Sequence, residues 1–170
     1  VSESTIEIGR IEANHGLSAI YFFQYDVFLN SLDHVRELQS LGHEVGYHYD
    51  VLDNNLGDIP AAILEFERNL DTFAEFGCRI KWICPHGNPA LRRTDWSSNK
   101  DFFRNCIVRS RFKGLKDIVV DFSQHFPEYF YISDVGYGFR IVSSISNNDQ
   151  IKSYDTPIEN IFQLIHDGRS

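Results

Sequence analysis

The sequence predicts an α/β protein whose parallel strands form an incomplete, distorted (β/α) barrel of the TIM-like kind, with a doubly wound open sheet as the alternative. The first observation behind this is an alternation of helix-type and strand-type segments over residues 3–84. Such alternation is typical of right-handed βαβ units and a parallel sheet. The second is that two strand-type segments end at a histidine, His48 and His86. Parallel strands end at one edge of a sheet, where α/β folds hold ligand and catalytic groups.

Three helices are expected in the first half of the chain, over residues 3–15, 32–41 and 59–76. The glycines that would end them are Gly16, Gly42 and Gly77. Ser31 and Asp58 precede the second and third helices and are residues that cap helices. The first helix has an imperfect apolar face, formed by Ile6, Ile8, Ile11 and Ala13. The third is the strongest, with a buried stripe of Ile59, Ile63, Phe66, Leu70 and Phe73.

The strand-type segments of the first half are residues 18–23, 43–48 and 79–84. The run SAIYFF at 18–23 is almost continuously apolar, which suits a strand buried on both faces. As an edge strand it would be left unpaired. The chain also opens and closes on helix-type segments, so we expect a further strand before Val1 and another after Ser170.

The remaining segments are less regular. Polar loops are expected around Asp53–Gly57 and over residues 85–97, and a short helix over 99–106. Further strands are expected at 118–122, 129–133 and 139–143, with a closing helix at 157–166. We find no internal repeat and no linker, so residues 1–170 are predicted to be a single domain.

Composition disfavours several classes of function. The formal net charge is −8, from 24 acidic and 16 basic residues, without a cluster of basic residues, so nucleic acid is not expected as a partner. No apolar stretch approaches the ~20 residues of a membrane helix, so no membrane span is expected. Three cysteines without CxxC spacing are typical of reduced thiols in a cytoplasmic protein.

The residues His43-Glu44 do not form an HExxH zinc site, because that site needs two histidines four residues apart on one helix face. His43 and His48 are five apart. His43 stands at the start of a strand, where a solvated or hydrogen-bonded structural role is expected. His48 ends that strand, and His86 follows the next one in Cys84-Pro85-His86-Gly87. Packing alone hardly explains two histidines at strand ends, and imidazoles suit a divalent metal, zinc above all, so both are predicted metal ligands.

At GHEVGYHY, residues 42–49, the sequence resembles the second motif of polysaccharide deacetylases of the nodulation-type homology domain, where a GHExGxH segment ends a barrel strand. Other segments resemble further parts of that barrel: GRIEANHGLSAIYFF, LEFERNLDTF, WICPHGNP and YFYISDVG. The resemblance is closest to a divergent bacterial branch associated with surface-polysaccharide biosynthesis, and it covers nearly the whole chain.

The resemblance implies a metal-dependent hydrolase that removes acetyl groups from an amino sugar of a surface polysaccharide or its precursor. His48 matches the first metal histidine of the family, but Leu52 stands where the second would be, and His86 is the candidate substitute. The metal and base aspartates of the family would precede Val1, and its acid histidine would follow Ser170. Cys84-Pro85-His86 replaces an Arg-Pro-Pro loop. The alternative is therefore a catalytically impaired carbohydrate-binding or scaffolding relative.

Asp50 and Asp134 are the candidate catalytic carboxylates. Asp50 either orients His48 or is an ordinary loop residue, and Asp134 either orients a ligand or catalytic group or caps a turn. The candidates for substrate binding lie beside the histidines or on the polar loop: Tyr49, Asn88, Asp95 and Trp96. Trp96 suits the edge of a sugar site, or it covers the core. Cys84 is a nucleophile or, as we favour, a buried structural thiol.

Overall fold

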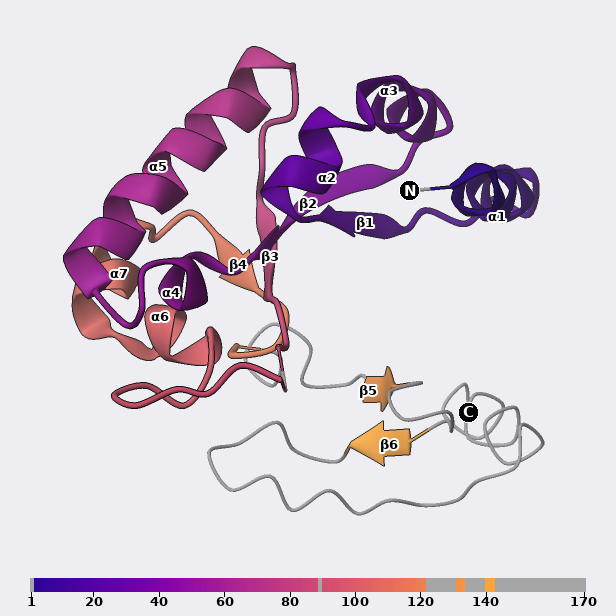
Figure 1. The fold of residues 1–170 in the computed structure, drawn as a ribbon. Coiled ribbons are helices and arrows are strands. Elements are labelled where there is room, and N and C mark those ends of the chain that lie inside the picture. Colours follow the sequence, from indigo (N-terminus) through magenta and orange to yellow (C-terminus); the bar gives the residue numbers. More distant parts are fainter. Residues whose placement is uncertain (1, 89, 122–130, 134–139, 143–170) are drawn as a thin grey trace. The chain divides into compact units, whose positions relative to one another are not determined.

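The computed structural model describes residues 2–88, 90–121, 131–133 and 140–142 (Figure 1). The chain divides into two units, Val1–Val120 and Asp121–Ser170, which we describe separately. The expectation of a single domain over residues 1–170 stays a prediction.

The first unit is a mixed α/β structure around a four-stranded parallel sheet. The strands are β1 Ile20–Phe23, β2 Glu44–Tyr49, β3 Trp82–Pro85 and β4 Lys116–Asp117. They pair in the order β1-β2-β3-β4, and each pair is parallel. The helices are α1 Glu3–Asn14, α2 Tyr25–Leu29, α3 Leu32–Ser40, α4 Val51–Asn54, α5 Ile59–Glu75, α6 Lys100–Arg104 and α7 Cys106–Arg111. The predicted α/β class and parallel sheet are confirmed.

The three predicted helices form, and their ends follow from local signals. Asp58 caps α5, because its Oδ1 accepts a hydrogen bond from the backbone N–H of Ala61 at 3.0 Å. Ser31 stands at the N-cap of α3 but makes no such bond with its side chain. The glycines that end these helices all have a positive φ, 70° at Gly16, 90° at Gly42 and 82° at Gly77.

The predicted apolar face of α1 is wrong at two positions. Ile8 and Ile11 are 53% and 54% exposed, whereas Ile6 and Gly9 are buried. Each helical residue turns the chain by about 100°, so Ile6 and Ile8 point in nearly opposite directions. Gly9 lies so close to α3 that a Cβ atom there would approach Leu38 Cδ2 to 2.7 Å, and α1 therefore packs through Gly9.

Several strand predictions also need correction. In β1 only Phe23 is buried, so the expectation of a strand buried on both faces is wrong. β2 begins at Glu44, which leaves His43 just before the strand. The predicted strand at 118–122 is wrong over 118–121, because residues 118–120 form a turn after β4. The N–H groups of Val119 and Val120 both donate to Asp117 Oδ1 at 2.8 Å, and this stabilises the turn.

Two short helices were not predicted. α2 follows β1 directly, and α4 includes Asp53 and Asn54, which were expected in a loop. The predicted helix over 99–106 is instead divided between α6 and α7. Asn105 separates them with extended backbone, and its Oδ1 accepts hydrogen bonds from Ile107 and Val108 at the start of α7.

In the second unit, the described residues form two antiparallel strands, β5 Tyr131–Ser133 and β6 Arg140–Val142. Strands were predicted at both places, and the described residues confirm them. The predicted helix at 157–166 and the residue Asp134 lie outside the described residues.

The core of the first unit determines which side of β2 faces the helices. Tyr47 and Tyr49 are fully buried, and both rings lie against Phe66 of α5, with centroids 5.2 and 5.8 Å away. Side chains alternate along a strand, so His48, between the two tyrosines, points to the opposite face of the sheet. No helix among the described residues is long and apolar enough to span a membrane.

Candidate functional site

His48 and His86 lie together at the C-terminal ends of β2 and β3. In the parallel pairing His48 is level with Cys84 and Tyr49 with Pro85, and the backbone N–H of His86 continues the ladder by donating to the Tyr49 carbonyl at 2.7 Å. The centroids of the two imidazole rings are 4.9 Å apart, and the ring planes meet at 74°. The structure thus brings together the two predicted metal ligands.

The surroundings of His48 favour its neutral imidazole. Burial lowers the pKa of His48, and so does the positive charge that His86 can carry, while a hydrogen bond with the Pro85 backbone opposes both. The Nδ1 atom of His86 is buried and has no hydrogen-bond partner among the described residues. A buried ring nitrogen without a partner is costly unless it binds something.

Asp50 follows β2 directly and is hydrogen-bonded to neighbouring amides. Its Oδ2 accepts from Gln24 Nε2 at 3.1 Å, and its Oδ1 accepts from Asn54 Nδ2 at 3.2 Å. Burial raises the pKa of Asp50 above its ordinary value, although the hydrogen bond from Gln24 and the charge on His86 act in the opposite direction. Asp50 therefore feels the charge that His86 can carry, but its hydrogen bonds go to Gln24 and Asn54 rather than to His48.

A second cluster, centred on Asp53 of α4, holds the loop that follows His86. Arg93 forms a bidentate ion pair with the Asp53 carboxylate, at 2.7 Å from Nε to Oδ1 and 2.6 Å from Nη2 to Oδ2. Trp96 Nε1 donates to Oδ1 at 2.6 Å, and Asn99 Nδ2 donates to Oδ2 at 2.9 Å. Asn99 Nδ2 also donates to the backbone carbonyl of His86 at 2.9 Å. We call these residues the Asp53 cluster, and it connects α4 to His86.

The Asp53 cluster was not predicted. Its members are separated by 40 or more residues from Asp53, and no spacing in the sequence signals their contact. One local sign exists at Gly57, which has a φ of 86° and where a Cβ atom would approach the Trp96 ring to 2.6 Å. A glycine is thus required there both by the backbone and by the tryptophan that packs over it.

The four predicted substrate-binding residues differ in burial and in their hydrogen bonds. Tyr49 is fully buried and donates its hydroxyl to Asp117 Oδ2 at 2.7 Å, which does not suit a substrate contact. Trp96 is half-buried, with its indole nitrogen bonded to Asp53, which fits the interpretation that it covers the core. Asn88 is half-buried on the loop after His86, and Asp95 is exposed beside Thr94.

Cys84 has the environment of a structural thiol. Burial raises the pKa of Cys84 to about 12, and the negative charge of Asp117 adds to this, while Lys100 opposes it. A thiol with such a pKa carries almost no thiolate at neutral pH and is a poor nucleophile.

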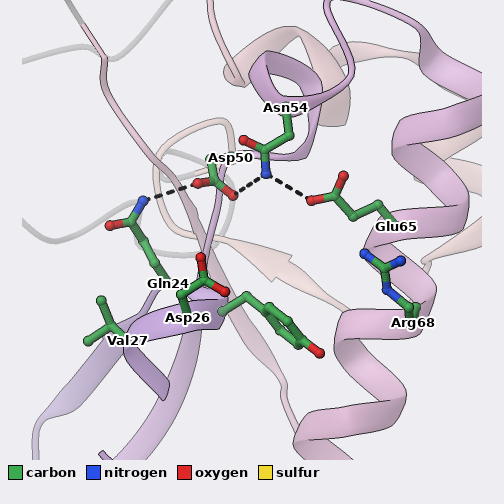
Figure 2. Close-up of a pocket in the computed structure, with 8 residues that line it drawn as sticks. Gln24, Asp26, Val27, Asp50, Asn54, Glu65 and Arg68 are labelled. Atoms are coloured by element: carbon green, nitrogen blue, oxygen red, sulfur yellow. Dashed lines mark hydrogen bonds between the residues drawn. The ribbon is translucent and has the colours of Figure 1, made fainter. Parts of the chain in front are cut away.

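A polar pocket of about 300 Å³ lies beside Asp50. Its walls come from residues 24–27 at the start of α2, from Asp50 and Asn54, and from Glu65 and Arg68 of α5. Figure 2 shows Gln24, Asp50, Asn54 and Glu65 joined by hydrogen bonds into one chain across the pocket.

The described residues do not supply a complete metal site. They contain no group of three or more His, Cys, Asp or Glu side chains that could hold a metal ion together. The histidine pair therefore fits as two ligands and not as a complete set. Comparison of the chain with protein-family models, with curated proteins and with solved structures finds no match.

Proposed function

We propose that the chain belongs to a metal-dependent hydrolase of the polysaccharide-deacetylase kind, which removes an acyl group from an amino sugar of a surface polysaccharide or its precursor. The observation that carries this proposal is the contact between His48 and His86, whose rings lie 4.9 Å apart at the ends of neighbouring parallel strands. Two imidazoles at the edge of a parallel sheet suit zinc.

The strand order supports the barrel that this proposal requires. Each strand from β1 to β4 lies beside the strand before it, in one direction and without reversal. This is the order in a (β/α) barrel, whereas a doubly wound sheet reverses direction at a switch point. Since Tyr47 faces α5, the alternating side chain of His48 would face the barrel interior. We therefore favour an incomplete, distorted barrel over the open sheet.

In this proposal His48 and His86 hold the metal, and His86 would use the buried nitrogen that has no partner among the described residues. A bound zinc ion would polarise the substrate carbonyl and lower the pKa of its water. Asp50, whose pKa is raised by burial, is the described carboxyl group that could hold or accept a proton beside the pair. A third metal ligand would have to come from outside the described residues.

The test measures zinc and acetate. We expect the purified protein to carry zinc by elemental analysis and to release acetate from oligomers of N-acetylglucosamine. His48→Ala and His86→Ala should each lose the zinc, because the pair would be reduced to one imidazole. His15→Ala is the matched control, since His15 is an exposed histidine at the end of α1. Retention of zinc in both pair variants would contradict the proposal.

A second candidate is a carbohydrate-binding or scaffolding relative without hydrolytic activity. The observation that favours it is Leu52, which occupies the position of the family's second metal histidine and is only 1% exposed in α4. A buried leucine cannot be a ligand and packs against the core instead. Binding of sugar oligomers without zinc and without acetate release would select this candidate.

A further inference from the structure

We infer that the polar pocket beside Asp50 binds one sugar ring that carries no acidic group. The choice of a sugar rests on the proposed function, whereas the pocket and its charges do not. The pocket lies at the C-terminal edge of the sheet, because Gln24 follows β1 and Asp50 follows β2 directly. This is the edge where parallel α/β folds bind ligands.

The size of the pocket suits a single ring. Its volume of about 300 Å³ is at the lower end of the range for small-molecule sites, roughly 300–1,000 Å³. Tyr25 and Val27 supply the apolar part of the wall, and the other six lining residues are polar or charged. A half-buried aromatic ring with several amides and carboxylates offers a sugar both an apolar surface and hydrogen-bond partners.

The hydrogen bonds across the pocket hold its polar groups in place before any ligand arrives. Asn54 Nδ2 donates to Asp50 Oδ1 at 3.2 Å and to Glu65 Oε1 at 2.8 Å, and Gln24 Nε2 donates to the other oxygen of Asp50. These bonds use both N–H donors of Asn54 and one of the two donors of Gln24. Each carboxylate oxygen can still accept from a ligand, since it has more than one lone-pair position. The fixed groups therefore present mainly acceptors, which match the hydroxyl donors of a sugar.

Arg68 adds a charged donor group to the pocket. The guanidinium of Arg68 lines the pocket and makes no hydrogen bond or ion pair with the described residues. It can donate to a ring or hydroxyl oxygen of the ligand. The pocket also contains three carboxyl groups, Asp26, Asp50 and Glu65, against this one guanidinium. Such an excess of negative charge disfavours a sugar acid and accepts a neutral or amino sugar.

Asp50 connects the pocket to the strand that carries His48. It follows β2 directly, two residues after His48, and its carboxyl group forms one wall of the pocket. Glu65 and Arg68 come from α5, which packs on the Tyr47 face of the sheet, opposite to His48. A ring bound in the pocket would therefore lie on that face, at the same edge of the sheet as the histidine pair.

The test is a titration of the full chain with N-acetylglucosamine, glucosamine and glucuronate. Binding is monitored by calorimetry or by the shifts of amide NMR signals. We expect the first two sugars to bind more tightly than glucuronate. Arg68→Ala should weaken their binding by about tenfold, because a hydrogen bond from a charged donor is lost. Arg36→Ala is the matched control, since Arg36 is an exposed arginine on α3 that pairs with Asp33.

Tighter binding of glucuronate, no saturable binding of any sugar, or equal affinities of Arg68→Ala and the wild type would each overturn the inference. A further variant separates it from the proposed function. His48→Ala should lose zinc and keep the sugar affinity, so the pocket stands even if no hydrolysis is found. Conversely, Arg68→Ala could bind zinc and release acetate as the wild type does. That result would support the hydrolase and reject the pocket.

Discussion

Asp53 and Arg93, 40 residues apart in the sequence, form a bidentate ion pair that is largely shielded from solvent. The side chains are 6% and 12% exposed, and two parallel hydrogen bonds of 2.7 and 2.6 Å join them. The same carboxylate binds Trp96 and Asn99, and Asn99 reaches the backbone of His86. The Asp53 carboxylate therefore connects α4 to the loop that begins at His86.

Asp53→Ala is expected to destabilise the protein by about 3–5 kcal/mol, because the Arg93 charge and the donors of Trp96 and Asn99 would lose their shared acceptor in a shielded site. The measurement is the free energy of unfolding in urea. The matched control is Asp33→Ala, whose side chain is 97% exposed and pairs with Arg36 on the surface. Its cost should be about 0–1 kcal/mol. Equal effects of the two substitutions would show that the Asp53 pair contributes no more than a surface pair.

The Asp53 cluster also predicts that the free energy of unfolding depends on pH in the acidic range. Burial by itself raises the pKa of Asp53, but the hydrogen bonds from Arg93 and Trp96 and the Arg93 charge prevail, so the pKa lies below the ordinary value of 3.8. A carboxyl group with a lowered pKa in the folded state adds stability above its unfolded pKa and loses it as the pH falls through the folded pKa. The wild type should therefore lose stability below about pH 4 more steeply than Asp53→Asn, which lacks the titrating group. Parallel stability curves from pH 6 to 3 would contradict this.

Elements with strong local signals were predictable from the sequence. α5 combines an N-cap at Asp58, apolar residues at helical spacing and a terminating glycine at Gly77, and it forms where expected. The histidine pair was predictable because each histidine was expected at the C-terminal end of a strand, and parallel pairing brings strand ends together. Both inferences need only short-range patterns and one rule of topology.

Features that depend on distant contacts were not predictable. α2 has only five residues, too few for a periodic pattern, and its Phe28 is buried against Phe73 of α5. The run after Asp117 has the composition of a strand, but the Asp117 side chain accepts two backbone N–H groups and stabilises a turn. The Asp53 cluster likewise joins residues whose proximity only the folded chain creates.

The cysteines should differ in their reaction with iodoacetamide at pH 8. Cys106 is exposed, whereas burial raises the pKa of Cys84 to about 12 and also raises the pKa of the buried Cys78. We expect mass spectrometry of the native protein to find Cys106 alkylated and the other two protected, and all three modified after denaturation. Alkylation of Cys84 as fast as Cys106 would restore the interpretation of Cys84 as a nucleophile.

His43 is expected to matter for stability and not for metal. It is buried, with its Nδ1 accepting from the backbone N–H of Ala19 at 3.1 Å and its Nε2 at 2.9 Å from the Gly9 carbonyl. His43→Ala would leave both backbone groups without this partner and would open a cavity. The free energy of unfolding should therefore fall by about 2–4 kcal/mol. The matched control is His34→Ala, whose side chain is 32% exposed and lies 3.8 Å from Glu3, and its effect should stay within about 0.5 kcal/mol.

Zinc content separates this structural role from that of His48. Both rings lie near the strand β2, but His43 bonds to Gly9 in α1 while His48 contacts His86. At a temperature where His43→Ala remains folded, that variant should bind as much zinc as the wild type, and His48→Ala should bind none. The reverse result, with zinc lost from His43→Ala and kept by His48→Ala, would mean that the metal binds on the α1 side of the sheet and that the histidine pair is not its site.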